Sequence, residues 1–270
     1  MTSTLAALAR IAPAGFGSRR AALLVERNVL VYRRTWLVIF SGFFEPLFYL
    51  LGIGFGLGVL IGGVTGPGGE QISYQLFVAP ALLATAAMNG AVAESTFNVF
   101  FKLNYAKTYD AILSTPLGVG DVALGEITWA LIRGGLYTVG FLVVMVVLGL
   151  AVTPWIVLAF PAALLIGFAF AAVGMAATSF MRSWQDFDLI QLVVLPLFLF
   201  SGTFFPLDAY PDALRIAVQL TPLYHGVDLI RSLAVGAVGP GLLVHIAYLL
   251  AMGLVGLVVV SRRLDRLLLK

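Results

Sequence analysis

The chain has 270 residues, of which 61% are hydrophobic and 11% charged, and it contains no cysteine. Soluble domains are roughly 45–50% apolar, so this composition predicts an integral membrane protein and leaves no room for a large soluble domain. The lack of cysteine excludes disulfides, thiolate metal sites and cysteine nucleophiles. The net charge of +3 is only weak evidence of an acidic partner.

Residues 1–36 precede the first apolar run and form a predicted cytoplasmic segment. Within it, the stretch from about Ser18 to Arg34 has the periodicity of an amphipathic helix. Such a helix lies in the membrane interface, with its arginines near lipid phosphates. A disordered tail is the alternative.

Six apolar runs follow, each long enough for a membrane-spanning helix of roughly 20 residues. They cover about 37–61, 76–97, 122–148, 155–181, 189–205 and 242–260. The predicted fold class is therefore all-α: a polytopic membrane protein with one transmembrane domain of six helices at 37–260 and a basic cytoplasmic tail at 261–270.

Basic residues are unevenly divided among the connections between these runs. Before the first run and after the second, fourth and sixth stand Arg10, Arg19, Arg20, Arg27, Arg33, Arg34, Lys102, Lys107, Arg182, Arg262, Arg263, Arg266 and Lys270. The opposite side has only Arg215 and Arg231, both in the fifth connection. By the positive-inside rule, both termini are expected in the cytoplasm.

The longest cytoplasmic connection contains a predicted short helix from Asn104 to Leu113. Asn104 is the expected cap and Pro116 the expected stop. Four side chains share one face at helical spacing: Tyr105, Tyr109, Ile112 and Leu113. This helix is either a docking site for a soluble partner or an ordinary interfacial helix.

The segment from Leu195 to Leu233 starts as an apolar run and is then interrupted at Gly202 and Pro206. Irregular backbone near a bilayer is tolerated only where protein or a wet cavity satisfies its hydrogen bonds. We therefore expect a half-inserted helical hairpin at about 204–233, with helices at about 209–220 and 222–233 and a turn at Thr221-Pro222.

Ionisable residues inside the apolar runs cost roughly 2.5–3.5 kcal/mol at mid-span, so each indicates a functional or paired group. They are Glu45, Glu94, Glu126, Arg133 and His245. For Arg133 we favour an interhelical ion pair with Glu45 or Glu94 over substrate contact. For Glu126 we favour an interfacial anchor, and for His245 a packed histidine over proton handling.

Motifs that would carry catalysis are absent. The chain has no G-x-x-x-x-G-K-[ST] loop, no H-E-x-x-H and no G-x-S-x-G. Energy for transport would therefore come from a gradient or from another subunit. A gradient-driven transporter or channel and an intramembrane enzyme are the alternatives to a subunit-driven permease.

Three segments resemble the permease subunits of type 2 ABC exporters, in the branch of lipo-chitooligosaccharide and anthracycline-resistance permeases. They are AILSTPLGVGDVALGEITWALIRG from Ala111, SGTFFPLDAYP from Ser201 and TPLYHGVDLIRSL from Thr221. The resemblance implies a non-enzymatic subunit of a bacterial inner-membrane exporter of amphiphiles. It also implies a second permease subunit, identical or different, and two cytoplasmic ATPase subunits. Those ATPases bind the ATP and magnesium, so this chain holds no cofactor, and its other contacts are lipids and not nucleic acid.

The resemblance also implies three groups of functional residues. The coupling helix, about 104–115, would contact the ATPase through Asn104, Tyr105, Tyr109, Asp110, Leu113 and Thr115. The translocation path would include Phe43, Phe44, Glu45, Glu94, Arg133, Phe198, Phe204 and Phe205. The outer gate would include Asp208, Tyr210, His225, Asp228 and Arg231.

Overall fold

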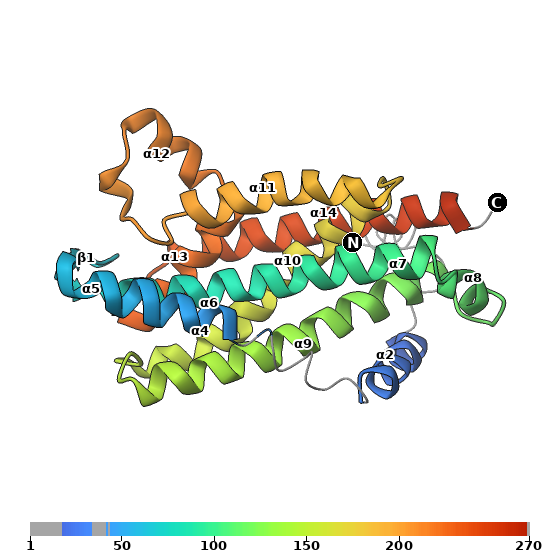
Figure 1. The fold of residues 1–270 in the computed structure, drawn as a ribbon, viewed down its shortest axis with the longest axis horizontal. Coiled ribbons are helices and arrows are strands. Elements are labelled where there is room, and N and C mark those ends of the chain that lie inside the picture. Colours follow the sequence, from blue (N-terminus) through green and yellow to red (C-terminus); the bar gives the residue numbers. More distant parts are fainter. Residues whose placement is uncertain (1–17, 34–41, 43, 269–270) are drawn as a thin grey trace, which may run out of the picture.

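The computed structural model describes residues 18–33, 42 and 44–268. Within these ranges five helices are long and apolar enough to cross a membrane. They run roughly along the long axis of the molecule in Figure 1. They are Phe44–Ile61, Tyr74–Asn104, Val119–Val147 (α9), Pro154–Thr178 (η3, Pro154–Leu158, and α10, Ala159–Thr178) and Leu242–Leu268 (α14).

The fifth predicted run does not form a helix of the same length. It forms the 3₁₀ turn η4 (Trp184–Asp186) and then α11 (Phe187–Phe200), which has only 14 residues. At 1.5 Å per residue such a helix spans about 21 Å, less than the roughly 30 Å hydrocarbon core. Gly202 ends this segment with φ +70°, a conformation that favours glycine.

A β-hairpin, which the all-α prediction did not include, connects the first two long helices. Strands β1 (Gly63–Thr65) and β2 (Gln71–Ser73) pair antiparallel with Val64 opposite Ile72. The glycine-rich loop between them turns at Gly69, whose φ is +82°. We call this end of the molecule, where α12 and α13 also lie, the hairpin end.

The interrupted segment after α11 contains the two short helices expected there. They are α12 (Asp212–Gln219) and α13 (Pro222–Val235), preceded by the 3₁₀ turn η5 (Leu207–Ala209). Thr221 caps α13 by accepting a hydrogen bond from the Tyr224 N–H, and Pro222 takes the first helical position. The insertion of this pair into a membrane stays a prediction.

The second long helix is the centre of the bundle. It consists of α6 (Tyr74–Ala93), the π-helical segment η2 (Glu94–Asn98) and α7 (Val99–Asn104). Of its most apolar 18-residue stretch 78% is buried, against 22% in both Phe44–Ile61 and α14. The first long helix also contains a π-helical segment, η1 (Leu50–Phe55), between α4 (Phe44–Tyr49) and α5 (Gly56–Ile61).

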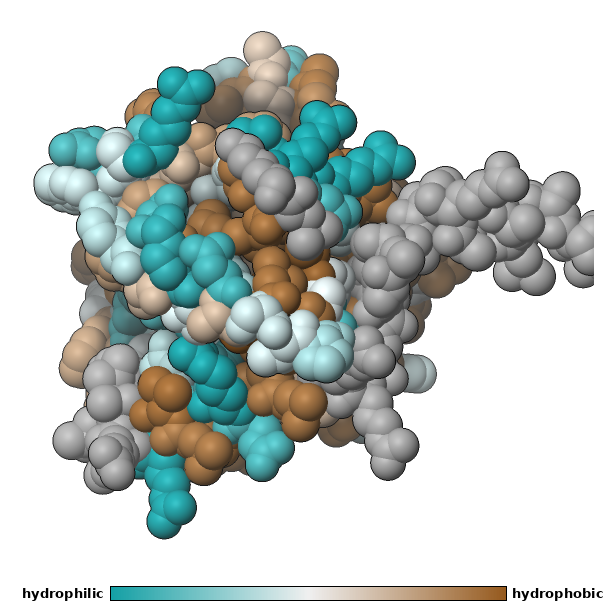
Figure 2. Space-filling view, turned by 90° about the vertical axis from the view of Figure 1, so that its right-hand side faces the viewer, coloured by the Kyte–Doolittle hydropathy of each residue, from teal (hydrophilic) through white to brown (hydrophobic). Residues whose placement is uncertain are grey.

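The opposite end, which we call the α8 end, contains α8 (Thr108–Leu113) and the C-terminal end of α14. The helix α2 (Ser18–Tyr32) lies nearby against α9. Figure 2 looks at this end and shows hydrophilic side chains gathered around smaller apolar areas. Described basic residues in α2, α7, α14 and the connections after α7 and α10 include Arg27, Lys102, Lys107, Arg182, Arg262, Arg263 and Arg266.

Candidate functional site

A cavity of about 690 Å³, which we call the central cavity, opens between five helical elements. They are the Phe44–Ile61 helix, the α6–η2 helix, α9, α11 and the end of α2, which contributes Tyr32. Its volume lies within the roughly 300–1,000 Å³ of pockets that hold small molecules. Polar, aromatic and aliphatic side chains all line it, so the central cavity is itself amphipathic.

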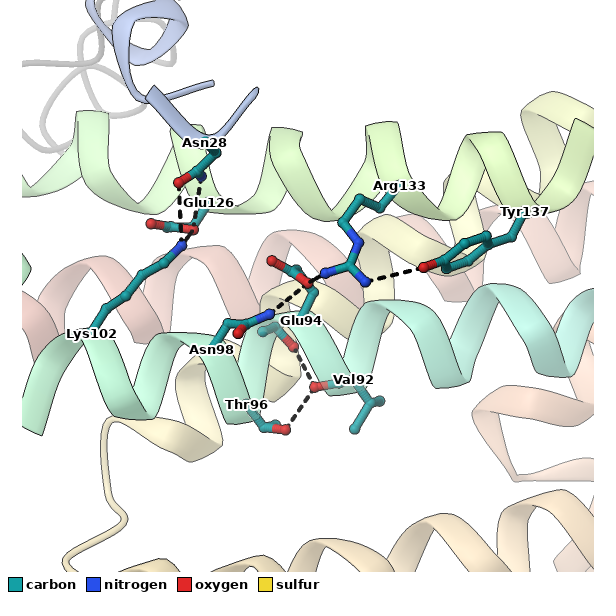
Figure 3. Close-up of polar contacts among 10 residues, drawn as sticks. Asn28, Val92, Glu94, Thr96, Asn98, Lys102, Glu126, Arg133 and Tyr137 are labelled. Atoms are coloured by element: carbon teal, nitrogen blue, oxygen red, sulfur yellow. Dashed lines mark hydrogen bonds and ion pairs between the residues drawn. The ribbon is translucent and has the colours of Figure 1, made fainter. Parts of the chain in front are cut away.

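The polar part is organised around Glu94, the first residue of η2. Asn98 donates a hydrogen bond from Nδ2 to Glu94 Oε2 at 2.7 Å, and the Thr96 hydroxyl donates to the Val92 carbonyl at 2.7 Å (Figure 3). A π-turn inserts an extra residue into the helix and is common at functional sites. Here it directs a carboxylate into the cavity wall.

Arg133 of α9 pairs with this carboxylate through Nη1 to Glu94 Oε2. Its Nη2 donates to the Tyr137 hydroxyl at 3.0 Å, so the guanidinium connects Glu94 to Tyr137 (Figure 3). The predicted interhelical pair of Arg133 is thus confirmed, with Glu94 as the partner. The other predicted partner, Glu45, instead accepts a hydrogen bond from Asn89 at 3.4 Å.

Three polar atoms in this cluster are buried without a hydrogen-bond partner among the described residues. They are Glu94 Oε1, Arg133 Nε and Asn89 Oδ1. A buried polar atom that makes no hydrogen bond costs about 1–3 kcal/mol. The cluster therefore has unused donor and acceptor capacity that water or the polar group of a ligand would satisfy.

The apolar part of the cavity is formed by aromatic rings and by α11. Tyr49 contacts Phe198 edge to face, with ring centroids 5.2 Å apart, and Phe97 contacts Phe187 at 4.9 Å. Every residue of α11 is at least partly exposed, so this helix lines the cavity without being enclosed by the described chain.

The predicted path residues are only partly brought together. Glu45, Glu94, Arg133 and Phe198 line the central cavity. Phe44 stacks on Phe48 outside the lining, and Phe43 lies outside the described residues.

Phe204 and Phe205 do not line the central cavity, and their place on a translocation path stays a prediction. The Tyr74 hydroxyl donates to the Phe204 carbonyl at 3.2 Å, and the Phe204 ring packs edge to face on Phe198 at 5.1 Å. Phe204 is therefore a core residue between α6 and α11. Phe205 is 54% exposed beside it.

Sequence reasoning missed most of the uncharged polar lining of the cavity, including Asn89, Asn98, Tyr137 and Gln191. A signal for two of them was present in the spacing. Asn98 follows Glu94 by four residues and Tyr137 follows Arg133 by four, so each shares a helical face with a charged residue already identified. No such spacing pointed to Gln191.

A second polar cluster lies at the α8 end and joins α2, α7 and α9. Glu126, which is 3% exposed, accepts from Lys102 Nζ at 2.7 Å and from Asn28 Nδ2 at 3.4 Å (Figure 3). Burial and the neighbouring Glu126 raise the pKa of Tyr109 in α8 well above its usual value. Glu126 is thus a buried residue that joins α2, α7 and α9 at the α8 end.

The predicted coupling helix is shorter than expected and begins four residues later, at Thr108. Asn104 ends α7 instead of capping α8, and its side chain donates to the Phe100 carbonyl. Lys107 precedes α8 with φ 49°. Tyr109 points into the core, whereas Tyr105 lies outside α8 and is 61% exposed, so these two rings do not form one docking face.

The exposed surface at α8 contains Tyr105, Lys107, Asp110, Ser114 and Thr115. Leu113 and Ile112 are half-buried beneath it. Contact of this surface with a partner stays a prediction.

The five predicted gate residues all lie at the hairpin end but have different surroundings. His225 and His245 approach through their Nδ1 atoms at 2.8 Å, and His245 Nε2 lies 3.1 Å from Asp228. Arg231 donates to the backbone carbonyls of Phe77 and Gly202.

Asp208 and Tyr210 complete this predicted group. Asp208 is exposed, while Tyr210 is 8% exposed and its hydroxyl lacks a partner among the described residues. Asp228 thus pairs with a histidine, and no aspartate among the described residues forms an ion pair with Arg231. Participation of these residues in a gate stays a prediction.

A bundle of long apolar helices, basic at one end and surrounding a cavity with an ion pair, defines a multi-pass membrane permease. Residues 20–235 match the family described as ABC-2 type transporter, and the chain belongs to this family. It is thus a non-catalytic membrane subunit of a bacterial ABC transporter, and ATP hydrolysis takes place on a separate partner.

Several relatives bear the name Nodulation protein J. The protein from Rhizobium leguminosarum bv. trifolii is 38% identical over 78% of this chain and 79% of its own length. That from Rhizobium leguminosarum bv. viciae is 35% identical over 89% and 93%, respectively. The protein from Azorhizobium caulinodans is 26% identical over 90% and 96%.

Proposed function

We propose that this permease exports an amphiphile with a polar, saccharide-like headgroup and an apolar tail, and that the central cavity binds it. The observation that supports this most directly is the lining of the cavity. The Glu94–Arg133–Tyr137 cluster and Asn89 suit a headgroup with many hydroxyl or amide groups, and the aromatic side of the cavity suits a hydrocarbon chain.

The α8 end faces the cytoplasm in this proposal, because most of the described Lys and Arg residues lie there. The exposed surface around Asp110 contacts the ATPase, and α12 and α13 form a re-entrant gate on the outer side. Two copies of the permease, or this chain and a related one, assemble with two ATPase subunits. The α11 wall, which the described chain does not enclose, lies near the seam between the permeases.

ATP-driven closure of the ATPases is transmitted in this scheme from α8 to the long helices through Tyr109 and the Glu126–Lys102 pair. A gradient-driven transporter, the alternative from sequence, is not favoured because the chain belongs to a family of ATP-driven transporters.

The test is transport by the complex purified from native membranes with its ATPase and reconstituted in proteoliposomes. ATP-dependent, vanadate-sensitive movement of a fluorescent acylated oligosaccharide is measured for the wild type, Val194→Trp and Val193→Trp. Val194 lines the cavity, whereas its neighbour Val193 is 58% exposed and does not. We expect Val194→Trp to lose most of its transport and Val193→Trp to keep it. Equal transport by both variants would reject the cavity as the path.

A further inference from the structure

A second cavity, of about 390 Å³, lies at the hairpin end and shares no lining residue with the central cavity. We call it the hairpin-end cavity. Its walls are the loop after β1, the start of α6, the segment from Gly202 to Asp208, one face of α13 and the start of α14. Segments far apart in the sequence thus build it within a single chain.

Arg231 is the deepest charged residue in the wall of this cavity, at only 4% exposure. Its Nε donates to the Phe77 carbonyl at 3.0 Å and its Nη2 to the Gly202 carbonyl at 2.6 Å. The guanidinium carbon lies 3.7 Å from the centre of the Phe77 ring. These contacts fix the plane of the guanidinium against α6.

The remaining nitrogen, Nη1, has no hydrogen-bond partner among the described residues, and no described carboxylate lies within 4.0 Å of Arg231. A guanidinium carries five N–H donors, and a buried charge is costly unless it is paired. Arg231 therefore presents fixed, unused donors in the cavity wall.

Acceptors stand in the same wall. Asp208 has no partner among the described residues, and the carboxylate of Asp228 lies 3.1 Å from Nε2 of His245. Two carboxylates disfavour a phosphate ligand and one buried guanidinium disfavours an ammonium ligand. A neutral group rich in hydroxyls can accept from Arg231 and donate to Asp208, so it satisfies both without leaving a charge unpaired.

We propose that the hairpin-end cavity is a binding site for the neutral, polyhydroxylated headgroup of the exported amphiphile. This inference rests on the proposed function and adds a second binding site for the headgroup, separate from the central cavity. The Tyr224 ring supplies an apolar wall, and Arg231 and Asp208 orient the hydroxyls.

The probe that tests this is dodecyl maltoside with a photoreactive diazirine next to the sugar. It is added to the nucleotide-free complex in lipid nanodiscs, and labelled peptides are identified by mass spectrometry. We expect labelling of residues 202–208 and 224–231 that excess unlabelled dodecyl maltoside prevents. Probes with the same chain and a phosphate or ammonium headgroup are expected to label these peptides weakly.

Asp208→Ala should lower this labelling about fivefold or more, because one hydrogen bond to a charged acceptor is lost. The matched control is Asp212→Ala, since Asp212 is 95% exposed in its side chain and does not line the cavity. Asp208 is also exposed, so its substitution should leave the fold intact. Labelling that is unchanged in Asp208→Ala, or equal for the phosphate probe, would overturn the proposal.

The two proposals can fail separately. Loss of selective labelling with ATP-driven transport retained would reject the hairpin-end site alone. Selective labelling without ATP-driven transport of acylated saccharides would reject the proposed function but would still support binding at the hairpin-end cavity.

Discussion

At the residue scale, the central cavity contains a largely buried ion pair between Glu94 and Arg133. Glu94 and Arg133 have side-chain exposures of 4% and 14%, and each also has an additional hydrogen-bond partner, Asn98 or Tyr137. Removing one partner of a buried pair leaves the other charge uncompensated, which is costlier than removing both. The pair therefore has a structural role whatever it does for cargo.

Arg133→Leu should consequently lower the free energy of unfolding by about 3–5 kcal/mol. Adding Glu94→Gln should recover part of this loss, because the lone carboxylate is then neutral. Thermal unfolding of the purified permease in detergent measures both effects. Arg215→Leu is the control, since its ion pair with Asp212 is exposed and contributes little. A stable Arg133→Leu variant, or a double variant weaker than the single one, would contradict the structural role.

At the element scale, α14 is held to α10 by close backbone approach. A Cβ atom on Gly256 would lie 2.8 Å from the carbonyl carbon of Ala172 and from the nitrogen of Val173. Backbone cannot move aside as a flexible side chain can. Small residues at such crossings are a common means of helix association in membranes.

Gly256→Ala should therefore destabilise the bundle by about 1–3 kcal/mol, as overpacking of a filled core does. Gly52→Ala is the matched control, because a Cβ at Gly52 meets no heavy atom within 4 Å. The melting temperatures of the two variants, measured in the same detergent, give the comparison. Equal melting temperatures would show that the α10–α14 contact is looser than the structure indicates.

The contact between α13 and α14 depends on protonation. His225 stacks on Tyr248 with ring centroids 4.0 Å apart, and its Nδ1 faces Nδ1 of His245, so one ring must donate and the other accept. Burial, aided by the nearby His245 and opposed by Asp228, lowers the pKa of His225 from its usual 6.5.

A lowered pKa means that the unfolded chain binds the proton more readily than the folded one. The stability contribution of His225 is therefore complete above pH 6.5 and is lost as the pH falls below it. The melting temperature of the wild type should drop from about pH 7.5 to about pH 5.5 by more than that of His225→Gln. Parallel pH profiles for the two proteins would contradict this assignment.

At the scale of the whole molecule, the proposed orientation predicts that the ATPase binds at the α8 end and not at the hairpin end. Asp110→Arg changes an exposed residue of α8, so the fold should be kept while the copurified ATPase and ATP-driven transport decrease. Asp212→Arg places the same change on an exposed residue at the hairpin end and should leave both unaltered. Quantifying the ATPase retained on the immobilised permease tests this. A complex unaffected by Asp110→Arg would rule out this face of α8 as the contact.

Much of this architecture was predictable from sequence, because hydrophobic runs and basic loops report directly on membrane helices and their ends. Long apolar runs predicted α9 and α10, and Pro222 predicted the start of α13. Arg133 was expected to pair, since a buried cation requires a partner.

Other features were not predictable because they depend on tertiary contacts. Tyr109 is buried near Glu126, although its spacing suggested a surface face. The π-helical segment η2, which begins at Glu94, could not be predicted because the amino-acid composition of this stretch does not indicate it. The fifth predicted run is as apolar as the others, yet it forms only the short α11, because the break at Gly202 ends the helix.

The π-turn η2 also determines how the molecule tolerates insertions and deletions. Glu94 lies at its start and Lys102 lies beyond its end, and each pairs with a residue of α9. One residue of helix corresponds to a rotation of about 100°. Removing the extra residue would turn Lys102 away from Glu126 or Glu94 away from Arg133, so the number of residues between Glu94 and Lys102 is fixed.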